Sequence, residues 1–140
     1  MTGISISGWG AVSPAGWSTK DLVAAVDANR NLPASKLDRP GWPNGLRMRR
    51  VPSPARPAAW MRHPRMRRTS PITRFATAAA LEALGDMVTP VRDGNHRLGI
   101  VFCVMAGCVN YSRRFFQEVL EDPSTASPLV FPETVFNHPC

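Results

Sequence analysis

The sequence predicts an α/β protein in which helices cover a layered sheet. Three segments support this: a short alternating apolar stretch near the start, a long amphipathic pattern in the middle and an unbroken apolar run after it. The whole order is strand, helix, irregular excursion, helix, buried strand, helix, and such alternation is typical of α/β folds. A length of 140 residues fits one domain with one hydrophobic core.

The first strand is predicted over residues 4–9, where isoleucines alternate with serines in the period-2 pattern of a strand with one buried face. Glycines follow and bracket a loop. Ser18 and Asp21 then form an S-x-x-D capping pattern. We therefore expect a helix from Thr19 to Ala28.

Residues 29–68 form the predicted excursion, because repeated X-Pro steps push the residue before each proline toward extended geometry. A short strand near Met48–Val51 is the one regular element expected there. No acidic residue occurs between Asp38 and Glu82. The same gap contains the arginines of one basic block, which are Arg47, Arg49, Arg50, Arg56, Arg62, Arg65, Arg67, Arg68 and Arg74.

The clearest helix begins after Ser70, a good N-cap, with Pro71 at the first helical position. Apolar residues then recur at i, i+3, i+4 and i+7 spacing from Ile72 to Leu84. Gly85 stands where a left-handed C-cap belongs. These features predict an amphipathic helix that ends at Leu84.

An unbroken apolar run over residues 98–104 has strand length and predicts a strand that is covered on both faces. A turn at residues 106–107 leads into a predicted helix, Tyr111–Glu121, and prolines break the segment after it. The outer side of that helix carries acidic residues expected to face solvent, which are Glu118, Glu121 and Asp122.

The cysteines and histidines predict no metal centre. Cys103, Cys108 and Cys140 are an odd number without metal-ligand spacing, which fits a reducing, cytoplasmic setting. We expect Cys103 and Cys108 to be packing residues, with Cys103 buried in its strand. The histidines are scattered along the chain, at His63, His96 and His138. No secretory signal pattern and no membrane-spanning run is found.

Four stretches resemble the amino-terminal portion of β-ketoacyl synthases, the condensing enzymes of fatty-acid and polyketide assembly. The opening turn, Gly8-Trp-Gly-Ala-Val-Ser-Pro-Ala-Gly16, is similar to that family's Gly-x-Gly-x-Val-Ser-Pro-x-Gly turn. The helix segment Arg68–Leu84 and the strand with its glycine turn, Leu98–Gly107, fit the elements that follow. Ser127–Asn137 resembles the family's Pro-x-x-x-Asn stretch, and Glu133 in it would cap a following helix.

The resemblance implies the incomplete amino-terminal half of a thiolase-like layered fold, with residues 1–140 as a β-ketoacyl synthase-like N-terminal domain. In that family one Cys and two His, or His and Asn, carry the chemistry, and all lie after the segment matched here. Cys140 follows Asn137-His138-Pro139, which the family pattern places upstream of the nucleophile. No catalytic, cofactor-binding or metal-binding residue is therefore assigned, and we expect this chain alone to be inactive.

The alternative explanation of Gly8-x-Gly10 is a phosphate-binding loop of a dinucleotide-binding fold. That pattern requires a third glycine at position 13, which is Ser13, and a helix that starts at once. The glycines are better explained as a sharp turn under other layers, since glycine reaches positive φ at no steric cost.

The net charge of +7 and the pI near 10.6 suggest a polyanionic partner, either nucleic acid or a membrane surface, although the charge is concentrated in the one basic block. Within the resemblance the partner would instead be an acyl carrier protein, together with a second synthase chain or a downstream half that covers apolar faces in an oligomer. One alternative is a non-catalytic partner subunit of a condensing enzyme. Another is a small basic nucleic-acid-binding module, in which Trp42 and Trp60 would stack on bases. The sequence shows no recognition helix for such a module. A solvated Arg/Pro loop remains the simplest explanation of the basic block.

Overall fold

The computed structural model describes residues 3–103, 109–128 and 131, and its contacts divide the chain into two compact units. The first unit lies within residues 1–58 and 75–96, and the second within 59–74 and 97–140. Helix α3 (Pro71–Leu84) gives its first turn to the second unit and its remainder to the first. Each unit is described separately below.

In the first unit, an extended segment leads into a tight turn in which Ser13 and Gly16 exchange backbone hydrogen bonds of 2.9 and 3.0 Å. Helix α1 (Thr19–Asp27) follows. The Ser18 hydroxyl oxygen accepts the N–H of Asp21 at 3.1 Å, so the predicted cap is confirmed. In the described residues, Ala25 of this helix is the one buried apolar side chain.

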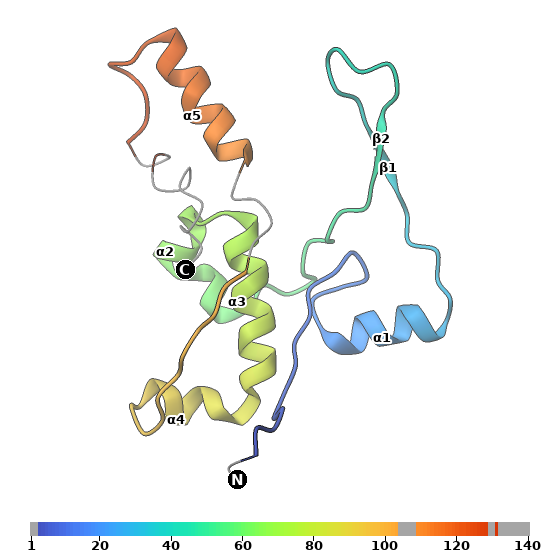
Figure 1. Cartoon of the computed structure of the whole chain (residues 1–140), viewed down its shortest axis with the longest axis vertical. Helices are drawn as coiled ribbons and strands as arrows, with labels where there is room; N and C mark the ends of the chain where they lie inside the picture. Colours follow the sequence, from blue (N-terminus) through green and yellow to red (C-terminus); the bar gives the residue numbers. More distant parts are fainter. Residues whose placement is uncertain (1–2, 104–108, 129–130, 132–140) are drawn as a thin grey trace. The chain divides into compact units, whose positions relative to one another are not determined.

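The strand predicted over residues 4–9 does not form, so that prediction was wrong. Ile4 and Ile6 are exposed, and no described strand pairs with this segment. A strand requires a neighbour that accepts and donates its main-chain hydrogen bonds. Instead, the segment continues into Gly8 and Gly10, which pack against α3. Figure 1 shows the extended chain before α1 running beside α3.

The excursion is more regular than the prolines suggested. Strands β1 (Ser35–Leu37) and β2 (Leu46–Met48) form an antiparallel hairpin, close to the short strand that was expected at Met48–Val51. Pro40 and Gly41 hold the centre of its loop, where Gly41 has a φ of +81°. Figure 1 shows the two strands as a narrow ribbon that ends in this loop.

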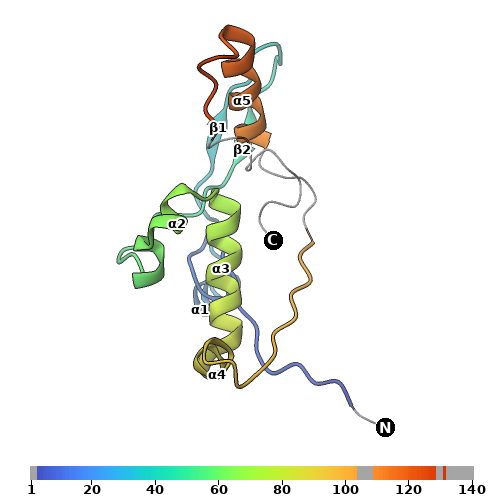
Figure 2. The same ribbon diagram turned by 90° about the vertical axis from the view of Figure 1, so that its left-hand side faces the viewer.

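Helix α3 has the predicted bounds, and the chain leaves it at Gly85 with a φ of +50°, as the C-cap prediction required. A 3₁₀ turn, η2 (Gly85–Met87), and the short helix α4 (Val88–Arg92) follow directly. Figure 2 shows α4 turned across the end of α3. The left-handed glycine therefore ends one helix and redirects the next.

The second unit begins with a 3₁₀ turn, η1 (Ala59–Arg62), the short helix α2 (Pro64–Arg68) and the start of α3. Ser70 is fully buried and its hydroxyl oxygen accepts the N–H of Thr73 at 3.3 Å, which confirms the predicted N-cap. The Arg74 guanidinium donates to the Thr69 carbonyl at 3.1 Å. The start of α3 is thus fixed by side chains on both sides of its cap.

The strand predicted over residues 98–104 is not seen in its described part, residues 98–103. Val101 is 92% exposed and Ile100 75%, so the prediction of burial on both faces was wrong. The apolar sequence pattern is present, but no described strand lies beside it to complete a sheet. Val104 lies outside the described residues.

Helix α5 (Val109–Glu121) contains the predicted helix and begins two residues earlier. Phe115 lies at its half-buried side, with its ring centroid 5.5 Å from that of Phe131. Leu120 of the same helix is 84% exposed. Across the described part of the chain, none of the helices combines the length and apolarity that crossing a membrane requires.

Candidate functional site

The candidate site is the opening turn, which the first unit holds tightly against α3. A Cβ atom placed on Gly8 would overlap the carbonyl oxygen of Ala83, and one on Gly10 would overlap that of Ala79. The two glycines are two residues apart on extended chain and the two alanines are one helical turn apart. Both glycines are therefore needed because the two backbones approach so closely. Neither glycine has a positive φ, so the requirement is for space and not for a left-handed conformation.

Glu82 binds the two ends of this turn together. One carboxylate oxygen accepts the N–H of Ala11 at 2.9 Å, and the other accepts the N–H of Thr19 at 2.8 Å. Thr19 is the first residue of α1, where N–H groups have no partner within the helix and negative charge is favourable. We call residues 8–19, held by Glu82, the anchored turn.

Trp17 adds a second attachment of the anchored turn. Its ring meets that of Phe75 edge-on, with centroids 5.4 Å apart and planes at 67°. Its indole N–H donates to the Pro52 carbonyl at 2.6 Å, and its backbone N–H donates to the Asp21 carboxylate at 3.2 Å. Apolar contact and hydrogen bonds thus fix the same side chain.

The hydrogen bonds of the anchored turn argue against a phosphate-binding loop. Such a loop presents free N–H groups at a helix N-terminus to an anion. Here the N–H groups of Ala11 and Thr19 donate to Glu82, and that of Trp17 donates to Asp21. Carboxylates already occupy the places where phosphate oxygens would lie, and their charge would repel a phosphate. The geometry supports an attachment point between turn and helix.

Sequence patterns missed Glu82, although a signal was present. It is the only acidic residue of α3, and it stands among alanines and leucines on a helix that otherwise reads as apolar packing. A lone carboxylate in such a helix is a candidate partner for main-chain N–H groups. Its partners, separated from it by 71 and 63 residues, could not be identified without the fold.

Of the cysteines and histidines considered in the sequence, the structure describes Cys103, His63 and His96. Cys103 is exposed, because its segment does not join a sheet, so the prediction of a buried packing residue was wrong. His63 caps α2, where its ring Nδ1 accepts the N–H of Arg65 at 3.3 Å. His96 is exposed in the other unit. The remaining positions lie outside the described residues, namely Cys108, Cys140, His138 and Glu133.

Within the residues that can be described, no group of three or more His, Cys, Asp or Glu side chains is arranged to hold a metal ion.

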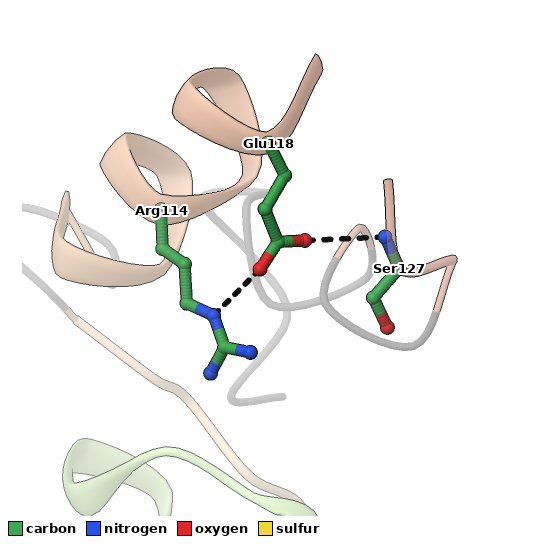
Figure 3. A network of polar contacts seen from close by, with 3 residues as sticks. All are labelled: Arg114, Glu118 and Ser127. Atoms are coloured by element: carbon green, nitrogen blue, oxygen red, sulfur yellow. Dashed lines mark hydrogen bonds and ion pairs between the residues drawn. The ribbon is translucent and has the colours of Figure 1, made fainter. Parts of the chain in front are cut away.

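Glu118 on α5 is a structural carboxylate rather than a simple solvent-facing charge (Figure 3). One of its oxygens accepts from Arg114 Nε at 2.8 Å and the other from the backbone N–H of Ser127 at 3.1 Å. The hydrogen bond from Arg114, and next the one from Ser127, lower the pKa of Glu118 below its ordinary value. This corrects the expectation for Glu118, whereas Glu121 is exposed as expected.

Asp122 ends α5 by forming a turn. Its carboxylate accepts the hydroxyl of Ser124 at 2.7 Å and the backbone N–H of the same residue at 2.9 Å. These two hydrogen bonds, in that order, lower the pKa of Asp122. The segment after α5 is thus held by two carboxylates, Glu118 and Asp122.

The basic block is divided between the units. Most of its described side chains are exposed, and these are Arg47, Arg49, Arg50, Arg56, Arg62 and Arg65. Arg74 differs because it is half-buried and donates to Thr69. Trp42 is exposed as well, while Trp60 lies in the other unit. Arg47, Arg49, Arg50 and Arg56 thus belong to the first unit, and Arg62, Arg65 and Arg74 to the second.

Comparisons with protein-family models, curated proteins and solved structures find no match to this chain.

Proposed function

We propose that this chain is the amino-terminal part of a β-ketoacyl-[acyl carrier protein] synthase-like protein that works in the cytoplasm in fatty-acid or polyketide-type biosynthesis. The observation that carries the proposal is the anchored turn. The Gly-x-Gly of the family-like motif packs backbone to backbone on α3, and Glu82 joins it to the start of α1. Those contacts fit a turn beneath a layered sheet and oppose a nucleotide loop.

In this proposal the chain supplies scaffold and no catalytic group. Claisen condensation requires a thiolate that holds the acyl chain and imidazoles or amides that polarise the thioester. No residue of this chain matches the positions that carry them in the resembled family. Cys103 is exposed at the end of the described apolar segment, and the family resemblance gives it no role as nucleophile.

Exposed apolar segments support a partner that completes the fold. Residues 98–101 and the isoleucines of residues 4–6 carry strand-like sequence and lie open to solvent. Pairing with further strands would cover them and satisfy their main-chain groups. The partner would be a second synthase chain or the remainder of a synthase, and an acyl carrier protein would bring the substrate.

Fragment complementation tests the proposal. A β-ketoacyl synthase that lacks its own amino-terminal segment is mixed with this chain, and condensation of acyl and malonyl carrier thioesters is measured. We expect activity only in the mixture. Gly10→Ala should abolish the restoration, whereas Lys20→Gln, on the exposed side of α1, should leave it intact. Condensation by this chain alone, or no restoration with a panel of such synthases, would refute the proposal.

The second candidate is a non-catalytic partner subunit that pairs with an active synthase. The same exposed apolar segments favour it, since a subunit interface would cover them as well. The two candidates differ when an intact synthase is supplied: a partner subunit changes the length of its products, and a synthase fragment does not.

A further inference from the structure

The β1–β2 hairpin has two chemically different faces. Lys36 lies directly opposite Arg47, and Leu37 lies opposite Leu46. Side chains alternate between the faces of a strand, so the two cations share one face and the two leucines share the other. Gly45 lies beneath the Lys36 and Asp38 side chains, which a Cβ at that position would meet.

The cationic pair lacks full compensation. Like charges directly opposite each other destabilise a strand pair. Asp38 forms an ion pair with Lys36, with its carboxylate 2.9 Å from Lys36 Nζ. The Arg47 side chain is exposed and makes no hydrogen bond or ion pair to any described residue. An anion between Lys36 and Arg47 would turn their repulsion into attraction.

A third cation, Arg49, is held in place immediately after β2. Arg49 Nε donates to the Leu32 carbonyl at 3.1 Å, and its Nη2 donates to the Asn31 side-chain oxygen at 3.0 Å. Both acceptors are neutral, so the guanidinium keeps its full charge while its position is fixed. We call Lys36 and Arg47 the basic face of the hairpin, and Arg49 is a fixed cation just after β2.

The hairpin loop presents an aromatic ring. Trp42 is 62% exposed, and the Arg39 guanidinium carbon lies 5.5 Å from its ring centroid. Trp42 donates its backbone N–H to the Arg39 carbonyl at 3.1 Å across Pro40-Gly41, with φ positive at Gly41. This turn brings the two side chains together. A planar surface for stacking is therefore built into the loop.

These observations favour a ligand that has both phosphates and flat rings. A lipid surface would have to meet the basic and the apolar sides at once, and Leu37 and Leu46 lie on the side opposite Lys36 and Arg47. An acidic protein would use the cations but would give Trp42 no role. Single-stranded nucleic acid uses both, because its backbone is anionic and every base has a π face.

We propose that the β1–β2 hairpin binds single-stranded nucleic acid, with phosphates on the basic face and a base stacked on Trp42. This inference goes beyond the synthase-like proposal and does not depend on it.

Fluorescence anisotropy with a labelled oligothymidylate or oligouridylate of about 12 nucleotides tests the site, since such sites span about 4–16 nucleotides. We expect binding that weakens steeply with salt. The Lys36→Gln/Arg47→Gln double variant should reduce the slope of log K against log salt by about 1.4, or about 0.7 for each phosphate contact. Trp42→Ala should weaken binding by about 5- to 150-fold, and Trp42→Phe should restore part of the loss.

Lys20→Gln is the matched control, since it removes one exposed charge from α1 in the same unit. All these positions are exposed, and circular dichroism checks that each variant is folded. If Lys20→Gln weakened binding as much as the hairpin variants do, the binding would depend only on overall charge, and the proposal would be overturned. It would also be overturned by absence of binding at low salt, indifference to Trp42→Ala, or equally good displacement by polyglutamate, which would indicate an acidic protein instead.

Discussion

Replacing Glu82 by alanine removes one carboxylate and leaves two main-chain N–H groups, those of Ala11 and Thr19, without their acceptor. The anchored turn would then depend on the glycine contacts with α3 and on Trp17. We expect the turn to open locally more often, because both lost hydrogen bonds lie at its ends. The Glu82→Gln variant keeps one side-chain acceptor and should lose one of the two hydrogen bonds.

The size of the effect follows from the hydrogen bonds. A hydrogen bond to a charged group contributes about 1.5–3 kcal/mol. Glu82 is only half-buried, so water replaces part of what is lost and the lower figure applies. Two bonds give about 2–3 kcal/mol for alanine, and one gives about 1–1.5 kcal/mol for glutamine. The critical expectation is that the anchored turn is least stable in Glu82→Ala, more stable in Glu82→Gln and most stable in the native chain.

Amide hydrogen exchange measured by NMR checks the effect at the two N–H groups themselves. A loss of about 2–3 kcal/mol corresponds to exchange about 30- to 150-fold faster at Ala11 and Thr19 in Glu82→Ala. Glu121→Gln, on the exposed side of α5, should leave both rates unchanged. If Glu82→Ala exchanges no faster than the Glu121→Gln control, the reasoning about the anchored turn is wrong.

Three other results are expected. Gly10→Ala should lower the free energy of unfolding by about 1–3 kcal/mol through overpacking, measured in urea, whereas Gly99→Ala, with open space around its Cβ, should change it little. Because the pKa of Glu118 is lowered, its hydrogen bond to Ser127 should persist above pH 4.5 and be lost as the pH falls through the folded pKa. The NMR shift of the Ser127 amide should therefore titrate with a midpoint below 4.5. Arg114→Ala should raise that midpoint, because it removes the first cause of the lowered pKa. Sedimentation velocity should show association that rises with concentration, and a monodisperse monomer with a sharp cooperative melt would contradict the need for a partner.

The helices were predictable because their determinants are local. Ser18 and Ser70 cap helices within three residues of themselves, and Gly85 ends one through its own backbone conformation. These interactions need no other part of the fold, so the sequence pattern was sufficient to locate them. The layered arrangement of a thiolase-like fold has no such local determinant and stays a prediction.

The strands could not be predicted in the same way. Residues 98–103 have the composition of a buried strand, but a strand exists only with a neighbour, and composition does not provide one. Conversely, β1 and β2 are only three residues each and half polar, yet they pair where Pro40-Gly41 turns the chain back on itself. Glu82 was missed for a similar reason, because its acceptor role depends on partners far away in sequence.

The long separation between Glu82 and Ala11 sets an order of events during synthesis. A loop of 71 residues must close before this hydrogen bond forms, at an entropic cost of about 4 kcal/mol for such a length. The cap of α1 is local and needs no later part of the chain. The opening turn must wait, flexible and open to proteases and chaperones, until α3 has been made.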